Sequence, residues 1–315
     1  MREVVGGLHS SSRWIAYLLA VASALGYATL GVFGLYGYAE HLSTFTMLAW
    51  RFGGASVVFI VWAIAARSGR PGRKDVIALV AMGAVGYTAM SWLFLEGARL
   101  ASVGLVSTAL YTYPALLAVA LAALSWEPLT RSKALALAAT FLGVALTALT
   151  GQGDPGTGPA PLLGILAGFS TGVIYVAYIL VGTPVLQRVT APVASAVVSI
   201  GATGAFVLIG GIAGGLGPVP LADAWIILGL VGPATVLAIV GFFVAIQQIG
   251  AGRAAMLSNA EPVGAVLLGW LALRQALTPW QLAGVVLVIA SAVFLRWERP
   301  QKARETVREE SGLGN

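Results

Sequence analysis

Ten apolar stretches, each about as long as a bilayer is thick, govern how this chain can fold. A helix needs about 20 mostly apolar residues to cross the hydrocarbon core. Backbone polar groups must be bonded internally there, which a helix achieves. We therefore predict an all-α membrane protein with ten transmembrane helices, near 14–35, 43–66, 75–96, 101–124, 131–151, 159–182, 191–214, 221–246, 252–273 and 278–297.

The composition excludes most other classes of protein. Of the 315 residues, 58% are hydrophobic and 10% are charged, whereas ordinary soluble domains have about 25% charged residues. A disordered chain, a coiled coil and an ordinary soluble enzyme are therefore excluded. The chain has no Cys and only His9 and His41, so we predict neither a disulfide nor a metal site, and no cofactor.

The positive charges indicate the orientation in the membrane. With the N-terminus in the cytoplasm, 15 of the 18 Lys and Arg residues fall on the cytoplasmic side, and only Arg99 and Arg274 fall opposite. This bias predicts that both termini are cytoplasmic. Residues 1–13 form an N-terminal tail and 298–315 a disordered C-terminal tail. We expect a multi-pass protein of the plasma membrane (the bacterial inner membrane) that binds no nucleic acid.

An internal repeat divides the chain into two halves. A shift of 148 residues aligns Phe94 with Phe242, Gly104 with Gly252, Pro114 with Pro262, and Leu129-Thr130 with Leu277-Thr278. The halves, 14–151 and 159–297, hold five stretches each. Because five is odd, the second repeat has inverted topology, the construction of many secondary transporters, with a central site and alternating access. The alternative is an old duplication in a membrane protein that transports nothing.

Three motifs resemble one family of transporters. They are Gly250–Val263 with its Glu261-Pro262 pair, Leu277–Gly284, and Thr46–Arg51 with its embedded arginine. With five-plus-five helices, the chain is similar to the drug/metabolite transporter (DMT) superfamily, in its EamA-type branch. The Tyr and Trp content of the apolar stretches is similar to that of YddG-like aromatic amino-acid exporters.

This resemblance implies the architecture of the site as well as the activity. It implies export of small metabolites, amino acids and drugs through a cavity between helices 1, 3 and 4 and helices 6, 8 and 9. Helices 5 and 10 would be peripheral. One departure is Gln275, where the family commonly has an acidic residue that the first-half counterpart, Glu127, keeps.

Two ionisable residues lie within the apolar stretches. Because such groups are costly in lipid, each is expected to have a binding partner or a function. Arg51 either pairs with a carbonyl or helix end, or binds a substrate carboxylate. Glu261 either attracts an ammonium group or takes part in proton coupling, or it is a buried carboxylate that caps a neighbouring helix. Ser258 and Asn259 lie within a turn of it and are further candidates for polar contacts with substrate.

Aromatic and hydroxyl side chains deep inside several stretches form a second set of candidates. A tyrosine hydroxyl in lipid needs a partner, and a cavity lined in this way suits an amphipathic zwitterion. Ordinary packing is the alternative for each of them. The candidate substrate-binding residues of this set are Tyr87, Ser91, Trp92, Tyr111, Tyr175 and Tyr178.

Glycines and prolines provide candidates for gating or structural roles. Gly168 is the middle member of two overlapping G-x-x-x-G patterns, which favour close helix packing, with a hinge as the alternative. Pro114 and Pro262 remove backbone donors inside their helices. Arg51 belongs to the same group of gating or structural residues.

The sequence as a whole predicts a secondary transporter and not an enzyme. It has no Walker motif, no H-E-x-x-H and no potassium-filter sequence. We expect export of small amphipathic metabolites, mainly amino acids, by a monomer or weak dimer in the lipid bilayer. One alternative is a multidrug exporter of hydrophobic cations with Glu261 as counter-ion. Another is a lipid-handling membrane protein that transports nothing.

Overall fold

The fold is a bundle of helices throughout the part of the chain that the computed structural model describes. These residues are 2–100, 106, 109–126, 128–150, 160–258, 260–273 and 279–297. The first half contains α1 (Arg2–Ala39), α2 (Thr44–Ala65), α3 (Arg73–Ala81), η1 (Met82–Tyr87), α4 (Thr88–Leu100), α6 (Tyr113–Ala123) and α7 (Arg131–Thr150). The second contains α8 (Pro161–Leu186), α9 (Ala191–Ile212), η2 (Leu221–Asp223), α10 (Ala224–Val231), η3 (Gly232–Leu237), α11 (Ala238–Ile249), α12 (Ala251–Ser258), α13 (Ala260–Leu273) and α14 (Pro279–Trp297).

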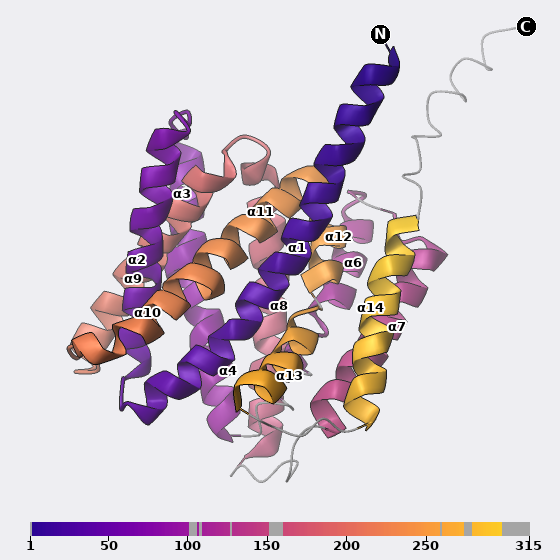
Figure 1. The fold of residues 1–315 in the computed structure, drawn as a ribbon. Coiled ribbons are helices and arrows are strands. Elements are labelled where there is room, and N and C mark those ends of the chain that lie inside the picture. Colours follow the sequence, from indigo (N-terminus) through magenta and orange to yellow (C-terminus); the bar gives the residue numbers. More distant parts are fainter. Residues whose placement is uncertain are drawn as a thin grey trace, which may run out of the picture.

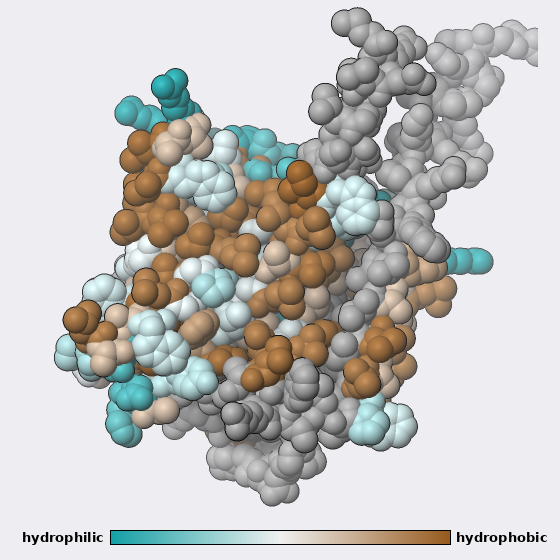
Figure 2. Space-filling model, in the orientation of Figure 1, coloured by the Kyte–Doolittle hydropathy of each residue, from teal (hydrophilic) through white to brown (hydrophobic). Residues whose placement is uncertain are grey.

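The surface of the bundle fits lipid rather than water. Large apolar side chains project outward, among them Ile212 at 81% exposure, Ile64 at 72% and Leu162 at 69%. Figure 2 shows that hydrophobic residues dominate the middle of one face and that hydrophilic residues gather toward its ends. A soluble monomer rarely exposes so much contiguous apolar surface.

Six helical segments of the described residues are long and apolar enough to cross a membrane. They are Trp14–Ala39, Thr44–Ala65, Arg73–Phe94, Leu162–Leu186, Ala191–Ile212 and Leu221–Ile249. The count of ten transmembrane helices stays a prediction.

The helices differ from the predicted stretches in three places. Helix α1 begins at Arg2 rather than near residue 14, since no proline interrupts the chain there. The third and eighth stretches each contain a π-helical turn, η1 and η3. A π turn is wider than an α turn and is often found at functional sites.

Corresponding helices of the two halves pack against one another. Helix α2 runs along α9, and α14 runs along α7 (Figure 1). The rings of Phe52 and Phe206 stack between α2 and α9, with centroids 5.8 Å apart. Helix α1 crosses α11 and α13. The start of α1, the end of α14 and the α2–α3 connection lie at the same end of the bundle (Figure 1).

Glycine lets two further parts of the bundle approach each other closely. A Cβ at Gly83 of η1 would lie 2.0 Å from the carbonyl oxygen of Val198 in α9. A Cβ at Gly168 of α8 would lie 2.5 Å from the carbonyl oxygen of Val106. Neither position has room for a side chain, and the contact at Gly168 is the close packing that its G-x-x-x-G spacing predicts.

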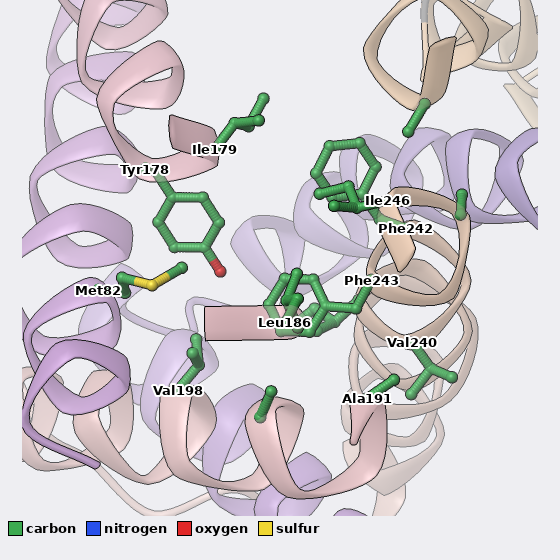
Figure 3. Packing of buried hydrophobic residues seen from close by; sticks show 14 of the residues in the cluster. Met82, Tyr178, Ile179, Leu186, Ala191, Val198, Val240, Phe242, Phe243 and Ile246 are labelled. Atoms are coloured by element: carbon green, nitrogen blue, oxygen red, sulfur yellow. The ribbon is translucent and has the colours of Figure 1, made fainter. Parts of the chain in front are cut away.

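An apolar core fills the space between η1, α8, α9 and α11. Figure 3 shows Met82, Tyr178, Val198, Leu186 and Phe243 from these elements pointing toward one another. The Tyr178 hydroxyl is buried and has no hydrogen-bond partner among the described residues. The hydroxyl of Tyr178 is therefore an unsatisfied polar atom next to the tyrosines described below.

Candidate functional site between the two repeats

Tyr87 lies at the end of η1 and joins α1 to the centre of the bundle. Its hydroxyl is 2.6 Å from the hydroxyl of Tyr27 in α1. Its ring meets Phe52 of α2 edge-on at 5.1 Å and Tyr178 of α8 edge-on at 5.5 Å. One tyrosine thus connects four elements through a hydrogen bond and two aromatic contacts.

A second group of aromatic rings surrounds Tyr175 of α8. The centroid of its ring lies 4.5 Å from that of Tyr113, 6.0 Å from that of Phe242 and 6.1 Å from that of Tyr178. The Tyr113 hydroxyl donates to the carbonyl oxygen of Ala255 in α12 at 3.2 Å. Because Tyr178 touches both Tyr87 and Tyr175, the two groups form one cluster, which we call the tyrosine cluster.

Glu261 is the acidic residue of this region. It lies in the first turn of α13, and its side chain shares a hydrogen bond with that of Tyr111. Glu261 is half-buried, whereas Tyr111 and Tyr113 beside it are buried. Ser258 is also buried, and its hydroxyl donates to the Ala254 carbonyl at 3.0 Å. A carboxylate among aromatic rings can attract a cation both by charge and through the faces of the rings.

Arg51 is bound by the protein itself. Its side chain is 2% exposed. Its Nε donates to Thr235 Oγ1 at 2.6 Å, and its Nη2 donates to the Ala234 carbonyl at 3.0 Å. This is the carbonyl pairing that one of the two interpretations of Arg51 predicts. Arg51 and Glu261 lie near enough to interact electrostatically, so each compensates part of the other's charge.

The remaining predicted residues lie outside the cluster or outside the described residues. Trp92 is 57% exposed on the surface of α4, and Ser91 beside it is half-buried. Asn259 falls outside the described residues, as does the side chain of Pro262, although its backbone lies in α13. Pro114 occupies the first turn of α6, where a proline costs the helix nothing.

Four members of the region were not among the predicted site residues. They are Tyr27, Tyr113, Thr235 and Phe242. The internal repeat contained a usable signal for three of them, because the shift of 148 residues relates Tyr27 to Tyr175, Tyr113 to Glu261 and Thr235 to Tyr87. Positions that correspond in the two halves therefore meet at the centre of the bundle.

Polar contacts join the halves at both ends of the bundle. At the end that holds the start of α3, Arg188 pairs with Asp75 at 2.7 Å. Beside it, within the second half, Gln247 Nε2 donates to the carbonyls of Leu186 and Val189 at 2.6 and 2.9 Å. At the other end, the backbone N–H of Gly217 donates to Thr46 Oγ1 at 2.9 Å.

Comparison with models of known protein families identifies the family of this chain. A model of the EamA-like transporter family matches residues 14–149 and again residues 162–297. The chain belongs to the EamA-like transporter family. The second match begins 148 residues after the first, the same interval as the internal repeat. The predicted EamA-type membership of the DMT superfamily is confirmed, and the chain is a multi-pass membrane protein of a family of transporters.

The fold is shared with a solved crystal structure. That structure matches this EamA-like chain with a TM-score of 0.75 and 20% sequence identity, and the match covers 89% of this chain and 96% of the chain in the solved structure. At that identity the likeness shows the fold alone. No curated protein matches the sequence. Among the described residues, no group of three or more His, Asp or Glu side chains could hold a metal ion.

Proposed function

We propose that this protein is a secondary transporter that exports small amphipathic metabolites, mainly amino acids and including aromatic ones. It works by alternating access between two five-helix repeats of inverted topology, with ten transmembrane helices in a bacterial inner membrane. The pairing of α2 with α9 and of α7 with α14 supports the proposal, because a twofold axis in the membrane plane would bring corresponding helices together. Export rather than uptake follows from the family resemblance.

The observation that carries this proposal is a half-buried carboxylate among tyrosines from both repeats. Tyr87 and Tyr111 come from the first repeat, whereas Tyr175 and Glu261 come from the second. An amino acid would place its ammonium group at Glu261 and its apolar side chain against the tyrosine rings. A site shared by the two repeats would also be exposed to either side when one repeat rocks against the other.

The positive charges at one end of the bundle support the proposed orientation. The end that holds the start of α1 and the end of α14 also holds the α2–α3 connection (Figure 1). That connection carries Arg67, Arg70, Arg73 and Lys74. Positive charge concentrates on the cytoplasmic side of a membrane protein, which supports the proposal that both termini are cytoplasmic.

A second candidate function keeps the fold and changes the solute. Arg51 is bound to Ala234 and Thr235, so it is not free to bind a carboxylate of the solute. The half-buried Glu261 would then act as the counter-ion of a hydrophobic cation, and the protein would export drugs. The tyrosine rings suit such a cation as well as they suit an amino acid.

Uptake into liposomes that hold the purified protein tests both functions. Labelled phenylalanine, threonine and tetraphenylphosphonium are offered, with empty liposomes as the background. We expect saturable phenylalanine uptake that Tyr111→Ala and Tyr175→Ala lower about tenfold, the equivalent of 1.4 kcal/mol. Tyr38→Ala is the matched control, since Tyr38 is exposed at the end of α1 and its hydroxyl shares a hydrogen bond with that of Thr44, away from the tyrosine cluster.

The variant Glu261→Gln separates the two candidates. Loss of phosphonium uptake with unchanged amino-acid uptake supports a drug exporter, whereas loss of amino-acid uptake supports the first proposal. Absence of uptake of all three solutes by the wild type would contradict both and favour a lipid-handling protein.

A further inference from the structure

The clamp that Arg51 forms joins the two repeats at a π-helical turn. Arg51 belongs to α2 of the first repeat, while Thr235 and Ala234 belong to η3 of the second. The guanidinium also lies over the Phe52 ring, 4.8 Å from its centroid. All of these contacts are buried, so little water competes with them and each is stronger than it would be at a surface.

The structure of η3 explains why it can accept these bonds. A π turn bonds each carbonyl to the amide five residues on, with poorer alignment than in an α-helix. Pro233 within η3 has no amide hydrogen to donate. Thr235 donates its hydroxyl proton to the Leu230 carbonyl at 2.6 Å and uses the same oxygen to accept from Arg51. Arg51 therefore adds one side-chain donor to the Ala234 carbonyl and another to the Thr235 hydroxyl of this turn.

The first repeat contains a similar π turn, η1, without such a clamp. Thr88, the residue directly after η1, donates its hydroxyl to the Gly83 carbonyl at the longer distance of 3.4 Å. The residue 148 positions after Arg51 is Ser199 of α9. Ser199 is fully buried, and its hydroxyl has no hydrogen-bond partner among the described residues. Within the described residues, no charged side chain hydrogen-bonds to η1.

We propose that Arg51 is a positioning residue that holds η3 rigid against α2, so that the bending needed for transport occurs at η1. The inference rests on the proposed transport function. It assigns different tasks to two turns of similar backbone form: η3 keeps the second repeat's side of the site in place, and η1 moves Tyr87 with α3 and α4. Arg51 itself touches no solute and acts through Thr235.

Hydrogen–deuterium exchange of the wild-type protein in lipid nanodiscs tests the rigidity directly. We expect the amides of 232–238 to exchange at least about tenfold more slowly than those of 82–88, because protection reports local opening. Arg51→Met should raise exchange at 232–238 to the level of 82–88 and leave 82–88 unchanged. Ser199→Ala, at the corresponding position, is the matched control and should change neither turn.

Two outcomes would overturn the proposal. One is equal protection of the two turns in the wild type, which needs no variant to observe. The other is an equal loss of protection at both turns in Arg51→Met. If that variant does not fold, the double variant Arg51→Met with Thr235→Val replaces it, since removing both partners leaves neither the guanidinium nor the threonine hydroxyl unpaired.

Transport kinetics supply the second readout. We expect Arg51→Met to lower the turnover of phenylalanine about tenfold while KM stays within about twofold, because a positioning residue does not bind solute. Arg51→Lys keeps the charge but loses the planar fork, so it should restore only part of the turnover. A raised KM with normal turnover would contradict the proposal. Absence of wild-type transport would refute the proposed function and leave the exchange result standing by itself.

Discussion

The two π turns have the same backbone form but are held in place by different means. Turn η1 packs against α9 through the contact of Gly83 with the Val198 backbone. Turn η3 also meets a glycine, Gly26 of α1, and in addition receives two hydrogen bonds from Arg51. The comparison teaches that the two copies of a repeat can keep a backbone irregularity while their side chains diverge. The difference allows one copy to be rigid and the other to move.

The largest effect is expected at the glycine that brings η1 against α9. Gly83→Ala places a methyl group against a backbone carbonyl that cannot turn away. Overpacking of this kind costs about 3 kcal/mol, so we expect the free energy of unfolding in detergent micelles to fall by that amount. Gly204→Ala in α9 is the control, because nothing lies within 4 Å of its added Cβ. Equal stability of the two variants would show that η1 does not depend on this contact.

The next largest difference is expected between Thr235 of η3 and Thr88, the residue directly after η1. Thr235→Val removes the acceptor of Arg51 Nε and the bond to Leu230. A buried donor of a charged group is then left unpaired, which costs about 2 kcal/mol. Thr88→Val removes only a long bond and should cost less than about 0.5 kcal/mol. Unfolding of the two variants by denaturant measures the difference, and similar losses would contradict the asymmetry.

A smaller effect of opposite sign is expected at Ser199. Its hydroxyl is buried with no partner in the part of the chain that the structure describes, and such a group costs the folded state about 1 kcal/mol. We expect Ser199→Ala to raise the free energy of unfolding by about that amount. Ser56→Ala in α2 is the comparison, because the Ser56 hydroxyl donates to the Gly53 carbonyl at 2.7 Å and its loss should not stabilise. A destabilised Ser199→Ala would mean that the hydroxyl has a partner in the membrane.

The smallest effect is expected at the ion pair between Asp75 and Arg188. The Arg188 side chain is 59% exposed, and exposed pairs contribute about 0.5 kcal/mol at most. Asp75→Asn should therefore lower the thermal midpoint only slightly, and less so in high salt. Asp223→Asn, 148 residues later, should have no effect, because Asp223 has no ion pair within the described residues. A large loss for Asp75→Asn would mean that this pair is much less exposed in the membrane.

Much of the fold could be predicted because a bilayer permits few structures. Apolar stretches of about 20 residues become helices in lipid, and the 148-residue interval of the sequence reappears in the two matches to the family model. The pairing of Arg51 with a carbonyl was one of two open interpretations. This interpretation was available because burying the Arg51 charge is costly unless the guanidinium has partners.

The irregular features could not be predicted in the same way. No local sequence pattern distinguishes the π turns η1 and η3 from ordinary helix, because they depend on tertiary contacts. Trp92, one of the predicted site residues, is exposed on the surface of α4. Tyr27 could have been found, because it corresponds to Tyr175 in the other repeat.

A reversible cross-link between the two repeats tests the central claim most directly. Asp75 and Arg188 belong to different repeats and lie in contact, and the chain has no native cysteine. The variant Asp75→Cys with Arg188→Cys is placed in liposomes, bridged with a short bis-methanethiosulfonate reagent and assayed for phenylalanine uptake before and after reduction. Alternating access predicts that bridging stops uptake, that reduction restores it, and that the two single-cysteine variants are unaffected. Undiminished uptake by the bridged protein would contradict movement of one repeat against the other.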